Sequence, residues 1–211
     1  MTAAGPGVFV TFEGVDGAGK STQLRLLAEA LRAAGRKVVV TREPGGAPGA
    51  EQIRRLLVEG EPGRWSAETE LLLFTAARRD HLERTLRPAL GAGAVVLCDR
   101  FADSTRAYQS AGRGADPAMV EALHAIAIGI EPDLTLVLDI DPDRALGRDG
   151  AAKGAETRFE AFGPDFQHRL RAAFLSIAAA APHRCVVIDA EGAPADVAAR
   201  IWAATGPRLG L

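Results

Sequence analysis

Cysteine is scarce in this sequence, which has only Cys98 and Cys185 among its 211 residues. Both lie inside apolar runs, VVLCD and RCVVID. This setting is typical of buried strand thiols and argues against a disulfide or a cysteine metal site. A strong basic charge is also missing, because the formal net charge is -2. The composition therefore indicates no nucleic-acid partner.

Long apolar stretches are missing as well. No run approaches the ~18 apolar residues of a membrane span. The N-terminal MTAAGPGVFV has neither the charged segment nor the apolar core of a signal peptide. We therefore expect a cytoplasmic protein without a membrane partner. With 47% hydrophobic and 25% charged residues, the chain is expected to form one globular domain, residues 1–211.

The sequence does contain a regular alternation of short apolar runs and longer helical patterns. Five runs predict strands: Val8–Phe12, Val38–Thr41, Val95–Cys98, Leu134–Leu138 and Val186–Ile188. Each run is almost wholly apolar, as expected of strands that are covered by helices on both faces. This rhythm predicts an α/β three-layer fold with a five-stranded parallel sheet.

Helices are predicted between these strands. One helix face, ended by Gly35, carries the stripe Leu24, Leu27, Ala28 and Leu31. A second helix is expected to start at the N-cap Ser66 and to run through LLLFTAARRDHLERTL. A third stripe, ended by Pro182, consists of Phe159, Phe162, Phe166, Leu170, Phe174 and Ile177. Arg54 and Arg55 are expected on a solvated helix face.

The stretch from Gly14 to Ser21 fits the pattern GxxxxGK[ST], after a predicted strand and before a predicted helix. Its glycines let backbone N–H groups turn inward around phosphate groups. Lys20 is expected to reach the β and γ phosphates of ATP, and Ser21, with Asp99 at the end of the third strand, to bind Mg²⁺. The predicted ATP-binding residues of this loop are Gly14, Val15, Asp16, Gly17, Ala18, Gly19, Lys20, Ser21 and Thr22.

A phosphate loop alone leaves several classes of protein open. A GTP-driven switch would need a guanine reader of the NKxD type, and this sequence contains no asparagine. The DxxG match Asp16–Gly19 lies inside the phosphate loop itself. A small-molecule phosphotransferase and a non-catalytic nucleotide-binding module stay open. Formation of ADP in the presence of an acceptor would distinguish them.

Four further stretches concern the acceptor: TREPGG, LLFTAARRDH, DRFADSTRAYQ and ETRFEAFGPDF. The second places Phe74 and Arg78 on one helix face. An aromatic ring beside a guanidinium can stack on a base and bind its edge, although a core Phe and a solvated Arg also fit this pattern. By itself, TREPGG fits a Pro-Gly turn with a surface ion pair. If DRFADSTRAYQ is helical, then Thr105, Tyr108 and Gln109 share a face.

Together these stretches resemble the thymidylate kinase family over almost the whole chain. The matching motifs are FEGxDGAGKST, TREPGG, LLFxAxRxxH, the DR…ST.AYQ stretch and the segment Glu156–Glu160. The resemblance implies transfer of the γ-phosphate of ATP to dTMP, with Mg²⁺ as cofactor, by a homodimer with a P-loop fold. A related deoxynucleoside or nucleoside-monophosphate kinase with another base preference is the alternative.

The resemblance also implies a set of dTMP-binding residues: Arg42, Glu43, Phe74, Arg78, Arg100, Thr105, Tyr108 and Gln109. In this scheme Phe74 stacks on thymine, Arg78 binds its O4, and Thr105 or Gln109 takes the other base edge. Tyr108 occupies the space of a ribose 2′-hydroxyl, which favours deoxyribose. Arg100, helped by Arg42, holds the monophosphate, and Asp16 lies near the acceptor sugar and phosphates.

The phosphate loop lacks the arginine that one branch of the family places there. The resemblance is therefore to the branch whose catalytic cation comes from a lid, which here spans residues 148–158. This lid follows a helix that begins at Asp141 and Pro142. Arg158 is expected at the phosphates, Lys153 as its helper and Arg148 over the adenine. The expected catalytic residues are thus Asp16, Lys20, Arg100, Lys153 and Arg158.

Overall fold

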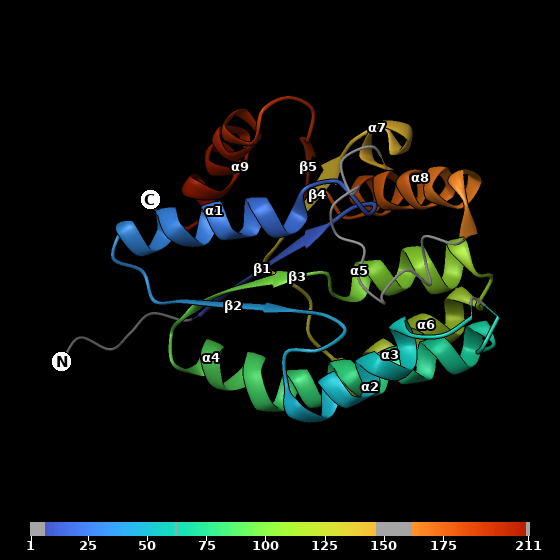
Figure 1. Ribbon diagram of the computed structural model, residues 1–211. Coiled ribbons are helices and arrows are strands. Elements are labelled where there is room, and N and C mark those ends of the chain that lie inside the picture. Colours follow the sequence, from blue (N-terminus) through green and yellow to red (C-terminus); the bar gives the residue numbers. More distant parts are fainter. Residues whose placement is uncertain (1–6, 62, 147–161, 210–211) are drawn as a thin grey trace.

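A computed structural model of the chain describes residues 7–61, 63–146 and 162–209. Five parallel strands form one sheet in the order β2-β3-β1-β4-β5 (Figure 1). They are β1 (Val8–Glu13), β2 (Val38–Arg42), β3 (Val95–Asp99), β4 (Leu134–Asp139) and β5 (Cys185–Asp189). All five predicted strands are confirmed. Each extends one residue further at its C-terminal end, and that residue is charged in every case.

Helices cover both faces of the sheet. On one face lie α1 (Lys20–Ala33) and α9 (Pro194–Leu209) (Figure 1). On the other lies α3 (Ala67–His81), which continues into the π-helical η1 (Leu82–Leu86) and α4 (Arg87–Gly91). The other helical segments are α2 (Pro48–Val58), α5 (Ala102–Thr105), η2 (Arg106–Gly112), α6 (Pro117–Leu123), η3 (His124–Ile128), α7 (Pro142–Leu146) and α8 (Pro164–Ala180).

The start and end signals of the helices agree with the structure in two of the three predicted cases. The α1 stripe is buried, and Gly35 follows the helix in the left-handed region with φ of 77°. Ser66 is the N-cap of α3, as predicted. The third prediction is wrong at its start. Gly163, with φ of 82°, precedes Pro164 at the first turn of α8, so Phe162 lies before the helix; Phe159 lies outside the described residues.

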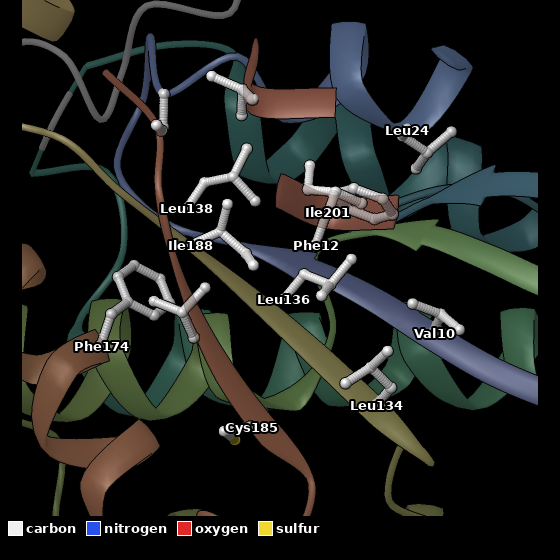
Figure 2. Close-up of a cluster of buried hydrophobic side chains, with 14 of the residues drawn as sticks. Val10, Phe12, Leu24, Leu134, Leu136, Leu138, Phe174, Cys185, Ile188 and Ile201 are labelled. Carbon is white, nitrogen blue, oxygen red and sulfur yellow. The ribbon is translucent and has the colours of Figure 1, made fainter. Parts of the chain in front are cut away.

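The core follows from the alternation of side chains along the central strands. Val10 and Phe12 of β1 point toward α1, where they pack with Leu136 of β4 and Ile201 of α9 (Figure 2). Phe9 points to the opposite face and belongs to a second cluster beneath η1. Within the described part of the chain, no helix has the length and apolarity required to cross a membrane.

We predict that removal of the α3 cap lowers stability without affecting activity. The Ser66 hydroxyl oxygen accepts a hydrogen bond from the Thr69 N–H at 3.2 Å. Ser66→Ala should therefore lower the free energy of unfolding by about 1 kcal/mol. Ser176→Ala, on the exposed side of α8, is the matched control and should be neutral or slightly stabilising because alanine is the better helix former. Chemical denaturation measures both; equal stabilities of the two variants would contradict the capping role.

Candidate active site

The loop between β1 and α1 is shaped to surround a phosphate group. Gly14, Gly17 and Gly19 have positive φ angles of 134°, 74° and 87°. At Gly14 a Cβ atom would lie 2.5 Å from the carbonyl oxygen of Leu138, so a side chain does not fit there. The N-cap of α1 is Gly19, which has no side chain to cap the first N–H groups of the helix. These donors and the helix dipole are therefore available to an anion.

Lys20 lies across this loop. Its Nζ donates to the carbonyl oxygens of Val15 at 2.7 Å and Gly14 at 3.2 Å. Burial and the nearby Arg100 guanidinium lower the pKa of Lys20, because both disfavour the charged ammonium. An incoming phosphate would offset both effects.

Ser21 and Asp99 join the start of α1 to the end of β3. The Ser21 Oγ donates to the Asp99 Oδ2 at 2.6 Å. A hydroxyl and a carboxylate next to a phosphate loop are the hard oxygen ligands that Mg²⁺ takes in nucleotide sites. The residues present therefore fit the predicted metal site.

Arg100 is the centre of the site. Its backbone, with φ of 69°, lies in the left-handed region although it is not a glycine. Its Nη1 donates to the Gly14 carbonyl at 3.1 Å and to the Ser104 Oγ at 3.0 Å. Its Nη2 donates to the Asp16 Oδ1 at 2.5 Å and to the Tyr108 hydroxyl at 3.0 Å. Backbone strain of this kind costs free energy and is common at functional sites.

Asp16 completes a triangle with Arg100 and Tyr108. The Tyr108 hydroxyl donates to its Oδ2 at 3.1 Å. Burial opposes the charge of Asp16, but Arg100 and Lys20 outweigh it and lower the pKa of this carboxyl. The acid in the phosphate loop is thus ionised and positions the guanidinium beside the loop.

Glu13 lies beneath Arg100, and the sequence pattern does not single it out. Its Oε1 accepts from the Phe101 N–H at 2.7 Å, and its Oε2 accepts from the Ser104 hydroxyl at 2.5 Å. The side chain is fully buried. Burial, together with the charge of Asp103, raises the pKa of Glu13 to about 8. In the sequence, Glu13 is an acid that directly follows an apolar strand, and it belongs to the FEGxDGAGKST motif without an assigned role.

Arg78 forms the far end of the site. Its Nε donates to the Glu43 Oε2 at 2.6 Å, and its Nη2 donates to the Phe101 carbonyl at 3.0 Å and the Thr105 Oγ1 at 2.9 Å. Nearby, the Nε2 of Gln109 is buried and has no hydrogen-bond partner among the described residues. This end of the site thus offers N–H donors to a ligand.

One cavity of about 520 Å³ joins these two ends. Its wall contains most of the predicted site residues: Asp16, Gly17, Gly19, Lys20, Ser21, Thr22, Arg42, Glu43, Phe74, Arg78, Asp99, Arg100, Thr105, Tyr108 and Gln109. Gly14, Val15 and Ala18 belong to the loop but do not line the cavity. The side chains of Val15 and Ala18 are packed in the core. The lid residues Arg148, Lys153 and Arg158 lie outside the described residues.

The cavity wall also contains residues that the sequence did not indicate: Pro44, Arg54, Val58, Phe101 and Ser104. The expected solvated helix face is confirmed for Arg55, which is exposed, but is wrong for Arg54. Arg54 is half-buried because α2 packs against the loop after β2, and its Nη1 donates to the Pro44 carbonyl. Helical spacing alone could not show this packing.

Arg42 and Glu43 differ in their surroundings although they are adjacent. Arg42 is exposed and pairs with Glu51 at 3.2 Å. The Glu43 carboxylate is buried behind Arg78 and also accepts from the His81 Nδ1 at 2.8 Å. Arg42 is therefore able to move toward a ligand, whereas Glu43 is held in place by α3.

A phosphate loop that shares one cavity with a second set of fixed donors defines a P-loop phosphotransferase with a small acceptor. A family model described as thymidylate kinase matches residues 12–201. A thymidylate kinase of Ruegeria pomeroyi is 64% identical over 88% of each chain, and one of Caulobacter vibrioides is 56% identical over 97% of this chain and 99% of its own. The crystal structure of thymidylate kinase from Ehrlichia chaffeensis is 36% identical, with a TM-score of 0.77 over 95% of this chain and 99% of that one. The chain belongs to the thymidylate kinase family.

We predict that stability falls as the pH rises through the range in which Glu13 titrates. The pKa of Glu13 is about 8 in the folded state and 4.5 in an exposed carboxyl. Between these values the folded chain holds a proton that the unfolded chain has lost, so the free energy of unfolding decreases as the pH rises. Glu13→Gln removes this titration and should flatten the decrease between about pH 5.5 and about pH 8.5.

Denaturation at both pH values measures the effect. Glu29→Gln is the matched control, because Glu29 is an exposed acid on α1 whose partner is the equally exposed Arg25. Its pH dependence should equal that of the parent. Identical slopes for the parent and Glu13→Gln would show that Glu13 does not titrate in this range.

Proposed function

We propose that this protein transfers the γ-phosphate of MgATP to dTMP, with dTDP and ADP as products, for dTTP synthesis. The observation that supports this most is the single cavity that extends from the phosphate loop past Arg100 to Arg78. A donor phosphate in the loop and a nucleoside monophosphate with its base at Arg78 would meet at Arg100. Phosphoryl transfer depends on this kind of positioning and on cations around the moving group.

On the donor side, the backbone N–H groups of the loop and Lys20 would bind the β and γ phosphates. Ser21 and Asp99 would hold Mg²⁺, which neutralises phosphate charge when it is bound. Thr22 lines the cavity directly behind Ser21. Phosphate oxygens would then replace the loop carbonyls as partners of the Lys20 ammonium.

On the acceptor side, Arg100 would hold the monophosphate, with Arg42 as a second cation. Arg100 is suited to this role because Gly14, Ser104, Asp16 and Tyr108 already fix its guanidinium. Little side-chain entropy is then lost when the phosphate binds. Arg42 has to leave its exposed pair with Glu51, which costs little.

The base would lie between Phe74 and the donors at the far end of the cavity. A guanidinium donates hydrogen bonds and accepts none. Arg78 therefore favours a base that has a carbonyl oxygen at this edge, such as the O4 of thymine, over one with an amino group. Thr105 or Gln109 would bind the other edge. Tyr108 would occupy the 2′ side of the sugar, and Asp16 would lie near the sugar and phosphates.

The cation that completes the transfer belongs, in this proposal, to the lid at residues 148–158. The phosphate loop supports this assignment because Val15, Asp16, Gly17 and Ala18 include no base. Arg158 would contact the moving phosphoryl group, Lys153 would assist it, and Arg148 would lie over the adenine. A fall in kcat for Arg158→Ala without a matching rise in the KM for ATP tests this role.

A homodimer is part of the proposal. Ile126 of η3 is 83% exposed and Leu72 of α3 is 49% exposed, on two elements that pack against each other. Large exposed apolar side chains on adjoining helices are typical of an interface between subunits. The mass in solution tests this state.

We predict that dTMP is the best acceptor in a panel of nucleoside monophosphates and nucleosides, followed by dUMP, which has the same carbonyl edge. Coupled ADP release measures kcat/KM for each compound. dCMP presents an amino group to Arg78 and should be poor, and unphosphorylated thymidine should be poor because Arg100 has no phosphate to bind. A preference for a purine monophosphate or for thymidine would refute the acceptor assignment.

We predict that Tyr108→Ala narrows the preference for deoxyribose. Tyr108 is 6% exposed, and its ring packs edge-on against Phe166 and Phe174. Its removal opens the space of a 2′-hydroxyl, so the kcat/KM ratio of dTMP to ribothymidine monophosphate should fall. Tyr108→Phe keeps the ring and should keep the ratio, although loss of the contacts with Asp16 and Arg100 should slow turnover. If the alanine variant discriminates as well as the parent, the ring serves packing alone.

A further inference from the structure

A buried chain of polar side chains runs from Arg78 and Glu43, which line the cavity, to His81 and Thr41, which do not. The Arg78 Nε donates to the Glu43 Oε2 at 2.6 Å, the His81 Nδ1 lies 2.8 Å from the Glu43 Oε1, and the His81 Nε2 lies 2.7 Å from the Thr41 Oγ1. The exposed fractions of the Arg78, Glu43 and His81 side chains are 5%, 3% and 0%. None of the roles proposed above uses His81 or Thr41.

The carboxylate of Glu43 fixes the direction of two hydrogen bonds in this chain. Arginine only donates, so the Glu43 carboxylate accepts at Oε2. Its Oε1 then accepts from the Nδ1–H of His81, and the His81 Nε2 shares a hydrogen bond with the Thr41 hydroxyl. In such chains the outer partner sets the tautomer and orientation of the histidine. Both oxygens of the Glu43 carboxylate therefore have a hydrogen-bond partner.

The surrounding loop is packed to keep this arrangement. A Cβ atom at Gly46 would collide with the Thr41 Oγ1 and lie 2.6 Å from the His81 Nε2. The Gly46 carbonyl accepts from the Thr85 hydroxyl at 2.7 Å. The turn after β2 is therefore packed closely over the contact between Thr41 and His81.

These contacts determine which nitrogen of Arg78 is left for a ligand. Its Nε and Nη2 are engaged by Glu43, Phe101 and Thr105, and Nη1 has no hydrogen-bond partner among the described residues. Because Arg78 lines the cavity, Nη1 is the nitrogen left for a ligand. A guanidinium fixed in this way presents a donor at one place and rejects a ligand atom that is also a donor.

We propose that His81 is a positioning residue for base selection, which holds Glu43, and through it Arg78, in the orientation that accepts a carbonyl and rejects an amino group. Thr41 orients His81 for this task. The inference rests on the proposed function, because it assumes that the base of the acceptor lies at Arg78. His81 itself does not line the cavity, so its effect on a substrate has to pass through Glu43.

The test compares dTMP with dCMP, which presents an amino group where thymine has O4. In His81→Ala, Glu43 loses a hydrogen bond and Arg78 gains freedom. The KM for dTMP should then rise by about tenfold, the size expected when a hydrogen bond to a charged group is lost. The efficiency with dCMP should stay unchanged, so the dTMP/dCMP ratio of kcat/KM should fall by about tenfold. The KM for ATP should stay within about twofold.

Two variants separate positioning from loss of stability. His81→Asn keeps an amide N–H near the position of Nδ1 and should restore most of the dTMP/dCMP ratio. Leu86→Ala, in the fully buried cluster beneath the sheet, should lower the melting temperature and leave the ratio unchanged. If His81→Ala does not fold, Thr41→Val decides the question, because it removes only the hydroxyl and should lower the ratio by about threefold.

The outcomes are distinct. A folded His81→Ala enzyme whose dTMP/dCMP ratio is within about twofold of the parent would overturn the inference and leave the proposed function intact. The inference is also overturned if Leu86→Ala narrows the ratio as much as His81→Ala does, or if His81→Asn restores nothing. A parent enzyme that prefers dCMP would refute both the inference and the proposed function.

Discussion

The parallel pairing of β1 with β3 is the constraint on which the rest of the site depends. In this register Phe12 lies opposite Asp99, and the Arg100 N–H donates to the Phe12 carbonyl at 2.9 Å. The phosphate loop and the Asp99–Arg100 pair therefore leave the sheet side by side. Without this pairing, Ser21 could not reach Asp99, and Arg100 could not reach Gly14 and Asp16. Ligand sites of open parallel sheets lie at this edge for the same reason.

Two of the arginines that line the cavity, Arg100 and Arg78, are held in the same way. Arg100 is paired with Asp16 at 2.5 Å and Arg78 with Glu43 at 2.6 Å, and each pair is largely withdrawn from water. The acids reduce the net positive charge of the cavity, but they hold both guanidinium groups in one orientation. Donors that are oriented before the ligand arrives need no rearrangement during the reaction, which is a main source of electrostatic catalysis. An isolated buried arginine would instead carry a large desolvation cost.

Much of the fold could be predicted from local patterns. The five strands follow from short apolar runs, and the cap of α3 follows from Ser66. The start of α8 was missed because helical periodicity ran through Gly163, where a positive φ interrupts the helix. The phosphate loop was recognisable because its function requires glycines and a lysine at fixed spacing. For Arg54 the periodicity indicated solvent, since the contact of α2 with the loop after β2 involves residues from two separate elements.

The sequence by itself determined the strands, the phosphate loop and the residue types around the acceptor, because each depends on neighbours close by along the chain. Only the tertiary structure decided that Glu13 bonds to Ser104, which is a partner of Arg100, and that His81 bonds to Glu43. Glu13 and Ser104 are 91 positions apart in the sequence, and Glu43 and His81 are 38 positions apart. Their partners are chosen by the order of strands in the sheet and by the packing of α3 against it. A local sequence pattern cannot predict these partners, because hydrogen bonding between buried groups depends on distance in space and not on separation along the chain.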